Sequence, residues 1–174
     1  MLKMQQQKTM PSRMKTSRSD SEAPTASDLQ RLAVDLLARR EHSRLELYRK
    51  LSSRTPDSGL VDSVLDDLTD RGWQSDERYC TVFLRSRLNR GSGPLRLKQE
   101  LRARGISDSV VATAFEELEA DWFELALAVA QKKRSALRSD PKWKEKLYRF
   151  LTYRGFDSEQ TRYAMETAEG QGDV

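Results

Sequence analysis

A repeat with a period of fifty residues is the feature of this 174-residue chain that most restricts its fold. Three kinds of position recur at that interval: Leu47, Leu97 and Leu147; Leu51, Leu101 and Leu151; and Arg54, Arg104 and Arg154. A fixed period in this range is typical of repeat proteins, in which each copy is one supersecondary unit that stacks on its neighbours. We therefore expect the function to lie on the surface of an array rather than in a pocket.

Apolar residues within each copy follow the spacing of one helical face. The first such face has residues at i, i+3, i+4, i+7 and i+8: Leu29, Leu32, Ala33, Leu36 and Leu37. No run of alternating apolar and polar residues, the usual sign of a strand, is present. The pattern predicts helices throughout.

Signals for helix ends divide the chain further. Three pairs have the spacing of a capping box: Ser27 with Gln30, Ser43 with Glu46, and Asp157 with Gln160. Gly72 stands where a left-handed residue ends a helix, and Pro94 suits the first turn of one. These signals predict three helices in each copy.

The predicted fold class is all-α, an elongated array of three tandem three-helix repeats. We place the repeats at residues 27–74, 75–120 and 121–169, between a disordered basic tail at 1–26 and a frayed end at 170–174. The tail is rich in Gln, Ser, Lys, Arg and Met, and such a segment buries too little apolar surface to offset its ordering entropy. A monomer is expected.

Composition points to a cytoplasmic protein. A single cysteine, Cys80, excludes an internal disulfide and favours a reducing compartment. No run of about 18 apolar residues is present, so we expect no membrane span. The first 26 residues lack the apolar region of a signal peptide.

The residues of the chain do not form an active site that we can identify. The only histidine, His42, stands directly before a helix cap, and Cys80 lies on an apolar helical face, so both are expected to be structural. No set of His, Cys, Asp and Glu has metal-ligand spacing. The turn at 91–94 lacks the Gly-Lys-Ser/Thr ending of a phosphate loop. We predict no enzyme activity, no cofactor and no metal.

Charge is instead segregated by helix. The chain has 31 basic and 27 acidic residues, with a net charge of +4, but 85–104 and 132–146 are mainly basic and 57–70 is mainly acidic. Stacked repeats would set these blocks in opposed stripes, with a basic surface for a polyanion or an acidic protein groove. The alternative is that the charges only make the protein soluble. The predicted contact residues are Arg85, Arg87, Arg96, Lys98, Arg102, Lys132, Lys133 and Arg134.

Several segments together resemble the RecX family of bacterial recombination regulators. They are residues 36–51, 76–87, 93–97 and 100–106, and the Arg154-Gly155-Phe156 turn with the helix after it. The resemblance covers roughly 27–168 in the family's order. Cys80 stands where the family more often has Ala, Thr55-Pro56 replaces a Gly-aliphatic turn, and the first 26 residues lie outside the pattern.

The resemblance implies an all-α array of three-helix repeats that binds the RecA recombinase in the groove of its nucleoprotein filament. It also implies inhibition of ATP hydrolysis, strand exchange and co-protease activity, without catalysis by the protein itself. The alternative is a stand-alone DNA-binding module that acts through its basic helices, with an affinity that falls steeply with salt. Arg54, Arg104 and Arg154 are either contact residues or structural residues near helix ends.

Overall fold

A computed structural model of the chain describes residues 23–137 and 139–170. Within these ranges the chain forms nine helices and no strand, which confirms the all-α prediction. The helices are α1 (Ala26–Leu37), α2 (Arg44–Ser52), α3 (Ser58–Asp70), α4 (Asp76–Leu88), α5 (Pro94–Ala103), α6 (Asp108–Glu117), α7 (Trp122–Ala136), α8 (Trp143–Arg154) and α9 (Ser158–Gly170). No helix in these ranges has the length and apolar character needed to cross a bilayer.

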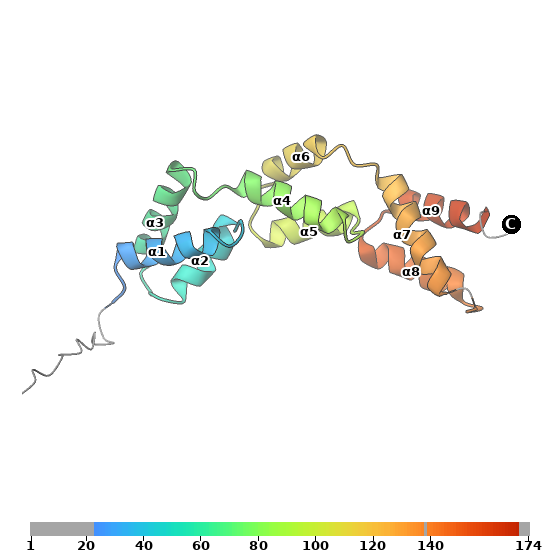
Figure 1. Ribbon diagram of the computed structural model, residues 1–174, viewed down its shortest axis with the longest axis horizontal. Helices are drawn as coiled ribbons and strands as arrows, with labels where there is room; N and C mark the ends of the chain where they lie inside the picture. Colours follow the sequence, from blue (N-terminus) through green and yellow to red (C-terminus); the bar gives the residue numbers. More distant parts are fainter. Residues whose placement is uncertain (1–22, 138, 171–174) are drawn as a thin grey trace, which may run out of the picture.

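Successive helix triplets lie one after another along the longest axis of the molecule (Figure 1). The second helices, α2, α5 and α8, lie along the lower side of Figure 1, and α3 and α6 along its upper side. Each triplet has its own cluster of buried apolar residues. We call the triplets the first, second and third repeats.

The leucines that recur every fifty residues occupy equivalent buried places. Their exposed fraction is 0% at all six positions: Leu47, Leu51, Leu97, Leu101, Leu147 and Leu151. Complete burial of a leucine side chain contributes about 1.5–3 kcal/mol. The periodicity therefore marks the core of each repeat.

The predicted helix ends agree with the structure at most positions. Asp157 and Gln160 cap α9 reciprocally, through N–H to side-chain oxygen distances of 3.1 and 2.8 Å. Gly72 has the expected positive φ of 67°, and Pro94 is the first residue of α5. These signals are local, so the sequence shows them directly.

The predicted start of the first helix was wrong. Thr25, not Ser27, caps α1, and it forms a capping box with Asp28. A carboxylate at this position also interacts favourably with the positive end of the helix dipole, which Gln30 could not do. Ala26 is therefore helical, although it belongs to the predicted tail; the rest of that prediction falls mainly on residues 1–22, outside the described residues.

The predicted box at α2 forms only in part. Ser43 accepts a hydrogen bond from the Glu46 N–H at 3.1 Å. The Glu46 carboxylate does not return to the Ser43 backbone but turns toward Tyr79 of the second repeat. The residue that looked like a local cap is part of a contact between repeats.

The second helices form a column in which the end of one meets the start of another. The Gly93 N–H at the start of α5 donates to the Arg154 carbonyl at the end of α8, at 2.8 Å. The Ser43 hydroxyl at the start of α2 donates to the Arg104 carbonyl at the end of α5, at 2.9 Å. Both joints use the same repeat positions. They also bring the negative end of one helix dipole to the positive end of the next.

Glycine ends two of these helices because the column leaves no space for a side chain. Gly105 and Gly155 have φ values of 78° and 89°. A Cβ on Gly105 would lie 2.8 Å from the Cβ of Leu45, and one on Gly155 would collide with Arg96. The equivalent residue of the first repeat is Thr55, at the free end of the column.

Candidate partner-binding surface

Each junction between adjacent repeats carries a groove. The first junction groove has a volume of about 370 Å³ and includes Arg40, Phe83 and Arg104 in its lining. The second junction groove has a volume of about 840 Å³ and includes Arg90, Lys133 and Arg154 at the positions fifty residues later. The two grooves therefore occur at equivalent positions of successive repeats but are lined by different side chains.

Glu46 lines the first junction groove and accepts hydrogen bonds from both repeats. Its oxygens lie 2.9 Å from Arg40 Nη1, 3.0 Å from the Tyr79 hydroxyl and 3.1 Å from His42 Nδ1. Arg104 Nε is 3.7 Å away. This carboxylate neutralises cations that would otherwise face solvent in the groove.

The titration behaviour of the cluster follows from these contacts. Burial alone would raise the pKa of Glu46, but the hydrogen bonds from Arg40 and Tyr79 outweigh it and hold the pKa below its ordinary value. Burial and the bond to Glu46 raise the pKa of Tyr79 to about 12. Burial, followed by the charge of Arg40, lowers the pKa of His42. Near neutral pH the cluster therefore holds an ionised Glu46 and a neutral Tyr79.

The expected structural role of His42 agrees with its environment, but its burial was not foreseen. Its exposed fraction is 3%, and its carbonyl accepts a hydrogen bond from Gln74 at 3.4 Å. The i, i+4 spacing of His42 and Glu46 was the available sign that the two side chains meet.

Glu100 forms two further ion pairs with basic side chains that line the first junction groove. Arg87 Nη2 lies 3.2 Å from the Glu100 carboxylate, and its guanidinium lies over the Phe83 ring. Arg104 lies over the same ring, 4.7 Å from its centroid, and 4.0 Å from Glu100. Three of the four basic side chains that line this groove are therefore paired within the protein; the fourth, Arg90, also lines the second junction groove.

The second junction groove is chemically different. It combines four basic side chains with the apolar Leu88, Leu125, Val129 and Phe150; the basic residues are Arg90, Lys132, Lys133 and Arg154. Its lining includes no acidic residue of the described chain. Lys133 and Arg154 lie over the Phe150 ring, at 5.2 and 4.9 Å. The Arg154 guanidinium also donates to the Arg90 carbonyl.

The structure divides the eight predicted contact residues among different surfaces. Arg87, Lys132 and Lys133 line the junction grooves. Lys98 and Arg102 face α6 instead, the first over the Phe115 ring and the second 2.7 Å from Asp108.

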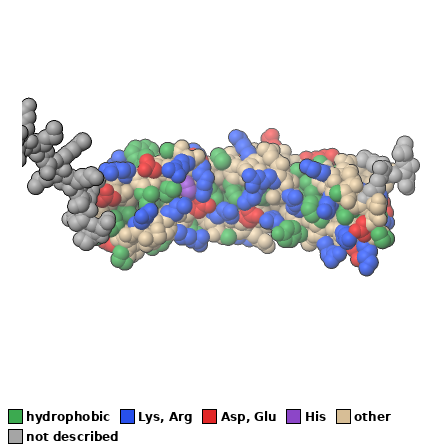
Figure 2. Space-filling view, turned by 60° about the horizontal axis from the view of Figure 1, so that its bottom comes forward, with side chains coloured by type: hydrophobic (Ala, Val, Ile, Leu, Met, Phe, Trp, Pro, Cys, Tyr) green, Lys and Arg blue, Asp and Glu red, His purple; other side chains and the backbone are tan. Residues whose placement is uncertain are grey.

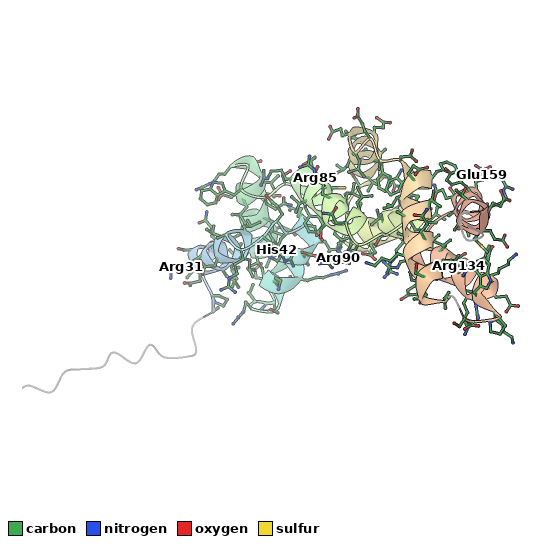
Figure 3. The ribbon with its side chains drawn as sticks, turned by 45° about the vertical axis from the view of Figure 1, so that its right-hand side comes forward. Arg31, His42, Arg85, Arg90, Arg134 and Glu159 are labelled. Carbon is green, nitrogen blue, oxygen red and sulfur yellow. The ribbon has the colours of Figure 1, made fainter. Side chains whose placement is uncertain are left out.

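The other three predicted residues also lie away from the junction grooves. Arg96 pairs with Glu100 at 2.8 Å and stacks on Tyr153. Arg134 stacks on Trp143 at 3.9 Å. Arg85 lies on the other side of α4 from Arg90 (Figure 3). Arg87 lines the first junction groove, and residues two apart in a helix point in different directions, so Arg85 points away from that groove. The eight residues do not form one patch.

Sequence reasoning missed two groove residues and left two others undecided. Arg40 and Arg90 were absent from the predicted contact set, although they stand fifty residues apart. Arg104 and Arg154, for which a contact role and a structural role were both open, each reach across a junction. Applying the repeat period to the basic residues would have found all four.

Separation of charge on the array is incomplete. Figure 2 shows Lys and Arg side chains along the length of one face, with acidic side chains among them. The acidic helix α3 is partly neutralised by Arg44 of α2, which lies 2.8 Å from Asp66 and 3.6 Å from Asp62. The basic surface is therefore strongest where such pairing is missing.

Metal-ligand clusters and the single thiol are the reactive groups to consider among the described residues. No group of three or more His, Cys, Asp and Glu among them could hold a metal ion. Cys80 has an exposed fraction of 0%, and burial raises its pKa to about 11. It is therefore a core thiol, as the apolar face predicted.

Comparisons with known proteins identify relatives over most of the chain. Family models for the second and third three-helix domains of RecX match residues 75–114 and 119–165. The regulatory protein RecX of Chromohalobacter salexigens is 44% identical over 136 residues, 78% of this chain and 90% of that protein. The regulatory protein RecX of Halorhodospira halophila is 42% identical over 151 residues, 86% of this chain and 94% of that one.

Two solved structures share the fold. The crystal structure of RecX from Lactobacillus salivarius has a TM-score of 0.71 at 21% identity, and it covers 83% of this chain and 96% of that chain. A second structure, described as the regulatory protein RecX, has a TM-score of 0.73 at 24% identity, over 81% and 73% of the two chains.

Proposed function

Because the chain belongs to the RecX family of regulatory proteins, we propose that it binds the nucleoprotein filament of the RecA recombinase and inhibits it. The inhibited activities are ATP hydrolysis, strand exchange and co-protease activity. The protein acts as a monomer in the cytoplasm and performs no chemistry of its own.

The observation that supports this proposal is the recurrence of a groove at both repeat junctions. A filament presents the same subunit surface many times, so a binder with repeated features can contact adjacent subunits at once. Several modest contacts then add up to a high affinity through effective concentration. An elongated array suits this mode of binding better than a compact protein with one pocket.

A titration of recombinase ATP hydrolysis on single-stranded DNA tests the proposal. We expect the rate to fall as the protein is added at a fixed recombinase concentration, and to recover when recombinase is added in excess. An unchanged rate, with the filament still assembled, would overturn the proposal.

A second candidate function is DNA binding without the recombinase. It is favoured by four basic side chains of the second junction groove that make no ion pair within the described residues. Such binding would come from neutralised phosphates and would weaken steeply with salt. Filter binding without recombinase separates the two functions: nanomolar affinity at physiological salt favours DNA, and micromolar or weaker affinity favours the filament.

A further inference from the structure

The two junction grooves share repeat positions but differ in net charge. Around the first junction groove, Arg40 and Arg104 pair with Glu46, and Arg87 pairs with Glu100. Around the second junction groove, none of the basic side chains has an ion-pair partner among the described residues; they are Arg90, Lys132, Lys133 and Arg154. Glu41 of the first groove is replaced by Gly91 in the second. Arg90 lines both grooves. The other cations of the first groove are neutralised by carboxylates of the protein, whereas the second groove has no acidic residue in its described lining and presents uncompensated positive charge.

The larger groove also presents apolar surface. Leu88, Leu125, Val129 and Phe150 contribute to its lining. Its volume of about 840 Å³ lies in the range of sites that hold several side chains or a small ligand. A site that bound its ligand through charge alone would not require this apolar surface, whose exposure to water is unfavourable.

The aromatic chemistry of the groove does not suit nucleobases. Phe150 is the only aromatic residue in its described lining, and both Lys133 and Arg154 already lie over the ring. Binding of single-stranded nucleic acid usually relies on open aromatic faces on which bases stack. The combination of apolar walls and unpaired cations instead complements a chain with both carboxylates and apolar side chains.

We propose that the second junction groove is a docking site for an acidic peptide segment with interspersed apolar side chains, and that the first junction groove is not. The carboxylates of the segment would pair with Lys132, Lys133 and Arg90, and its apolar side chains would contact Leu125 and Val129. The class of partner, an acidic peptide segment, is inferred from the groove itself. That this segment belongs to the recombinase filament rests on the proposed function.

Fluorescence anisotropy with the full-length chain tests the proposal. The probe is a labelled synthetic peptide of Glu and Asp interspersed with Leu and Phe. Lys132→Gln combined with Lys133→Gln should weaken binding about tenfold, since two interfacial ion pairs are lost. Both residues are on the surface of α7, so the fold should persist, which circular dichroism checks.

The matched control removes the same charge elsewhere. Arg31→Gln combined with Arg39→Gln alters two exposed residues of the first repeat, and Arg31 lies at the far end of the array (Figure 3). We expect its affinity for the peptide to equal that of the wild type. Equal losses in the two double variants would mean that net charge alone binds the peptide, and would overturn the proposal.

Further measurements test the apolar contacts, the location of the site and its preference for a peptide over another anion. Replacing Leu and Phe of the probe by Ser should weaken binding at least about tenfold, since the apolar contacts are removed. Ala128→Glu, at an exposed position of the groove, should weaken binding of the original probe by repelling its carboxylates, which places the binding in this groove. Preference for single-stranded DNA over the peptide at the same ionic strength would assign the groove to phosphates and overturn the proposal.

The recombinase assay distinguishes failure of this inference from failure of the proposed function. If wild-type protein inhibits ATP hydrolysis and the Lys132/Lys133 double variant inhibits equally well, the groove is not the docking site and the function stands. If wild-type protein does not inhibit, the function is wrong, and the peptide titration still decides what the groove binds.

Discussion

At the scale of single residues, a few exchanges between repeats change what a shared position does. Tyr79 donates a hydrogen bond to Glu46 in the first junction, whereas Val129, fifty residues later, presents only an apolar side chain to the second. Glu46 itself corresponds to Arg96, which pairs with Glu100 instead. The backbone is repeated, but the electrostatics of each junction depend on the local side chains.

We predict that stability falls as the pH drops below about 6.5 because of His42. Burial lowers its pKa from the ordinary value of 6.5, so the unfolded chain binds a proton that the folded protein resists. The unfolding free energy is therefore at its full value above pH 6.5 and decreases below it. Urea titrations followed by circular dichroism between about pH 7.5 and pH 5 measure this slope.

The control for this prediction is His42→Gln. His42 is the only histidine of the chain, so the variant should show a flatter profile in that range. It should retain a fall at lower pH, since the pKa of Glu46 lies below its ordinary value of 4.5 and its stabilisation is lost only when it is protonated. An unchanged slope between pH 7 and pH 5 in the variant would contradict the assignment to His42.

At the scale of helices, the column of second helices determines how the repeats are spaced. The joint between α8 and α5 relies on close backbone contact: a Cβ on Gly93 would collide with the backbone of Gly155 and Phe156. Ser43 occupies the equivalent position in the first repeat and makes the joint with its hydroxyl. The two junctions are therefore held by different groups in the same place.

Gly93→Ala should destabilise the protein through this joint. The added methyl group must push α5 and α8 apart, and overpacking of this kind costs about 1–3 kcal/mol. The hydrogen bond from the Gly93 N–H to the Arg154 carbonyl would lengthen at the same time. Chemical denaturation followed by circular dichroism gives the change in unfolding free energy.

Gly59→Ala is the matched control, because the nearest atom to a Cβ there is 3.4 Å away. Its position in the first turn of α3 leads us to expect an unchanged or higher stability, by at most about 1 kcal/mol. If both variants unfolded at the same denaturant concentration, the close approach at Gly93 would make no contribution to the free energy of unfolding.

At the scale of the whole molecule, stability depends on stacking. The three repeats have separate apolar clusters, and each is about the size below which an isolated core is insufficient. The central repeat contacts both neighbours through its joints, at Ser43 with Arg104 and at Gly93 with Arg154. In repeat proteins the energy of such interfaces couples the units.

Leu101→Ala should therefore affect the entire array. We expect a loss of about 2–5 kcal/mol, as for other leucines with no exposed surface. Because the central repeat supports both ends, helix content should still disappear in one cooperative step at a lower urea concentration. A two-step curve, with most of the helical signal unaffected, would show that the repeats unfold independently.

Much of the architecture was readable from the sequence, because its causes are local. Apolar spacing defines helical faces, the six recurring leucines mark the cores, and caps such as Asp157 with Gln160 act within a single turn. Of the two exceptions, the cap at Thr25 was a choice between neighbouring residues, and Glu46 meets Tyr79 of the next repeat instead of completing its box. The division of the chain into helices therefore did not need a structure.

Tertiary structure alone decided which cations are available to a partner. Arg104 and Lys132 belong to equally basic stretches, yet Arg104 meets Glu46 across the first junction, whereas the groove around Lys132 has no acidic residue in its described lining. Ion pairing acts over a few ångströms, and the joints connect residues as far apart as Ser43 and Arg104. A pattern read along the chain cannot show which charges meet at that distance; the stacking of the repeats determines it.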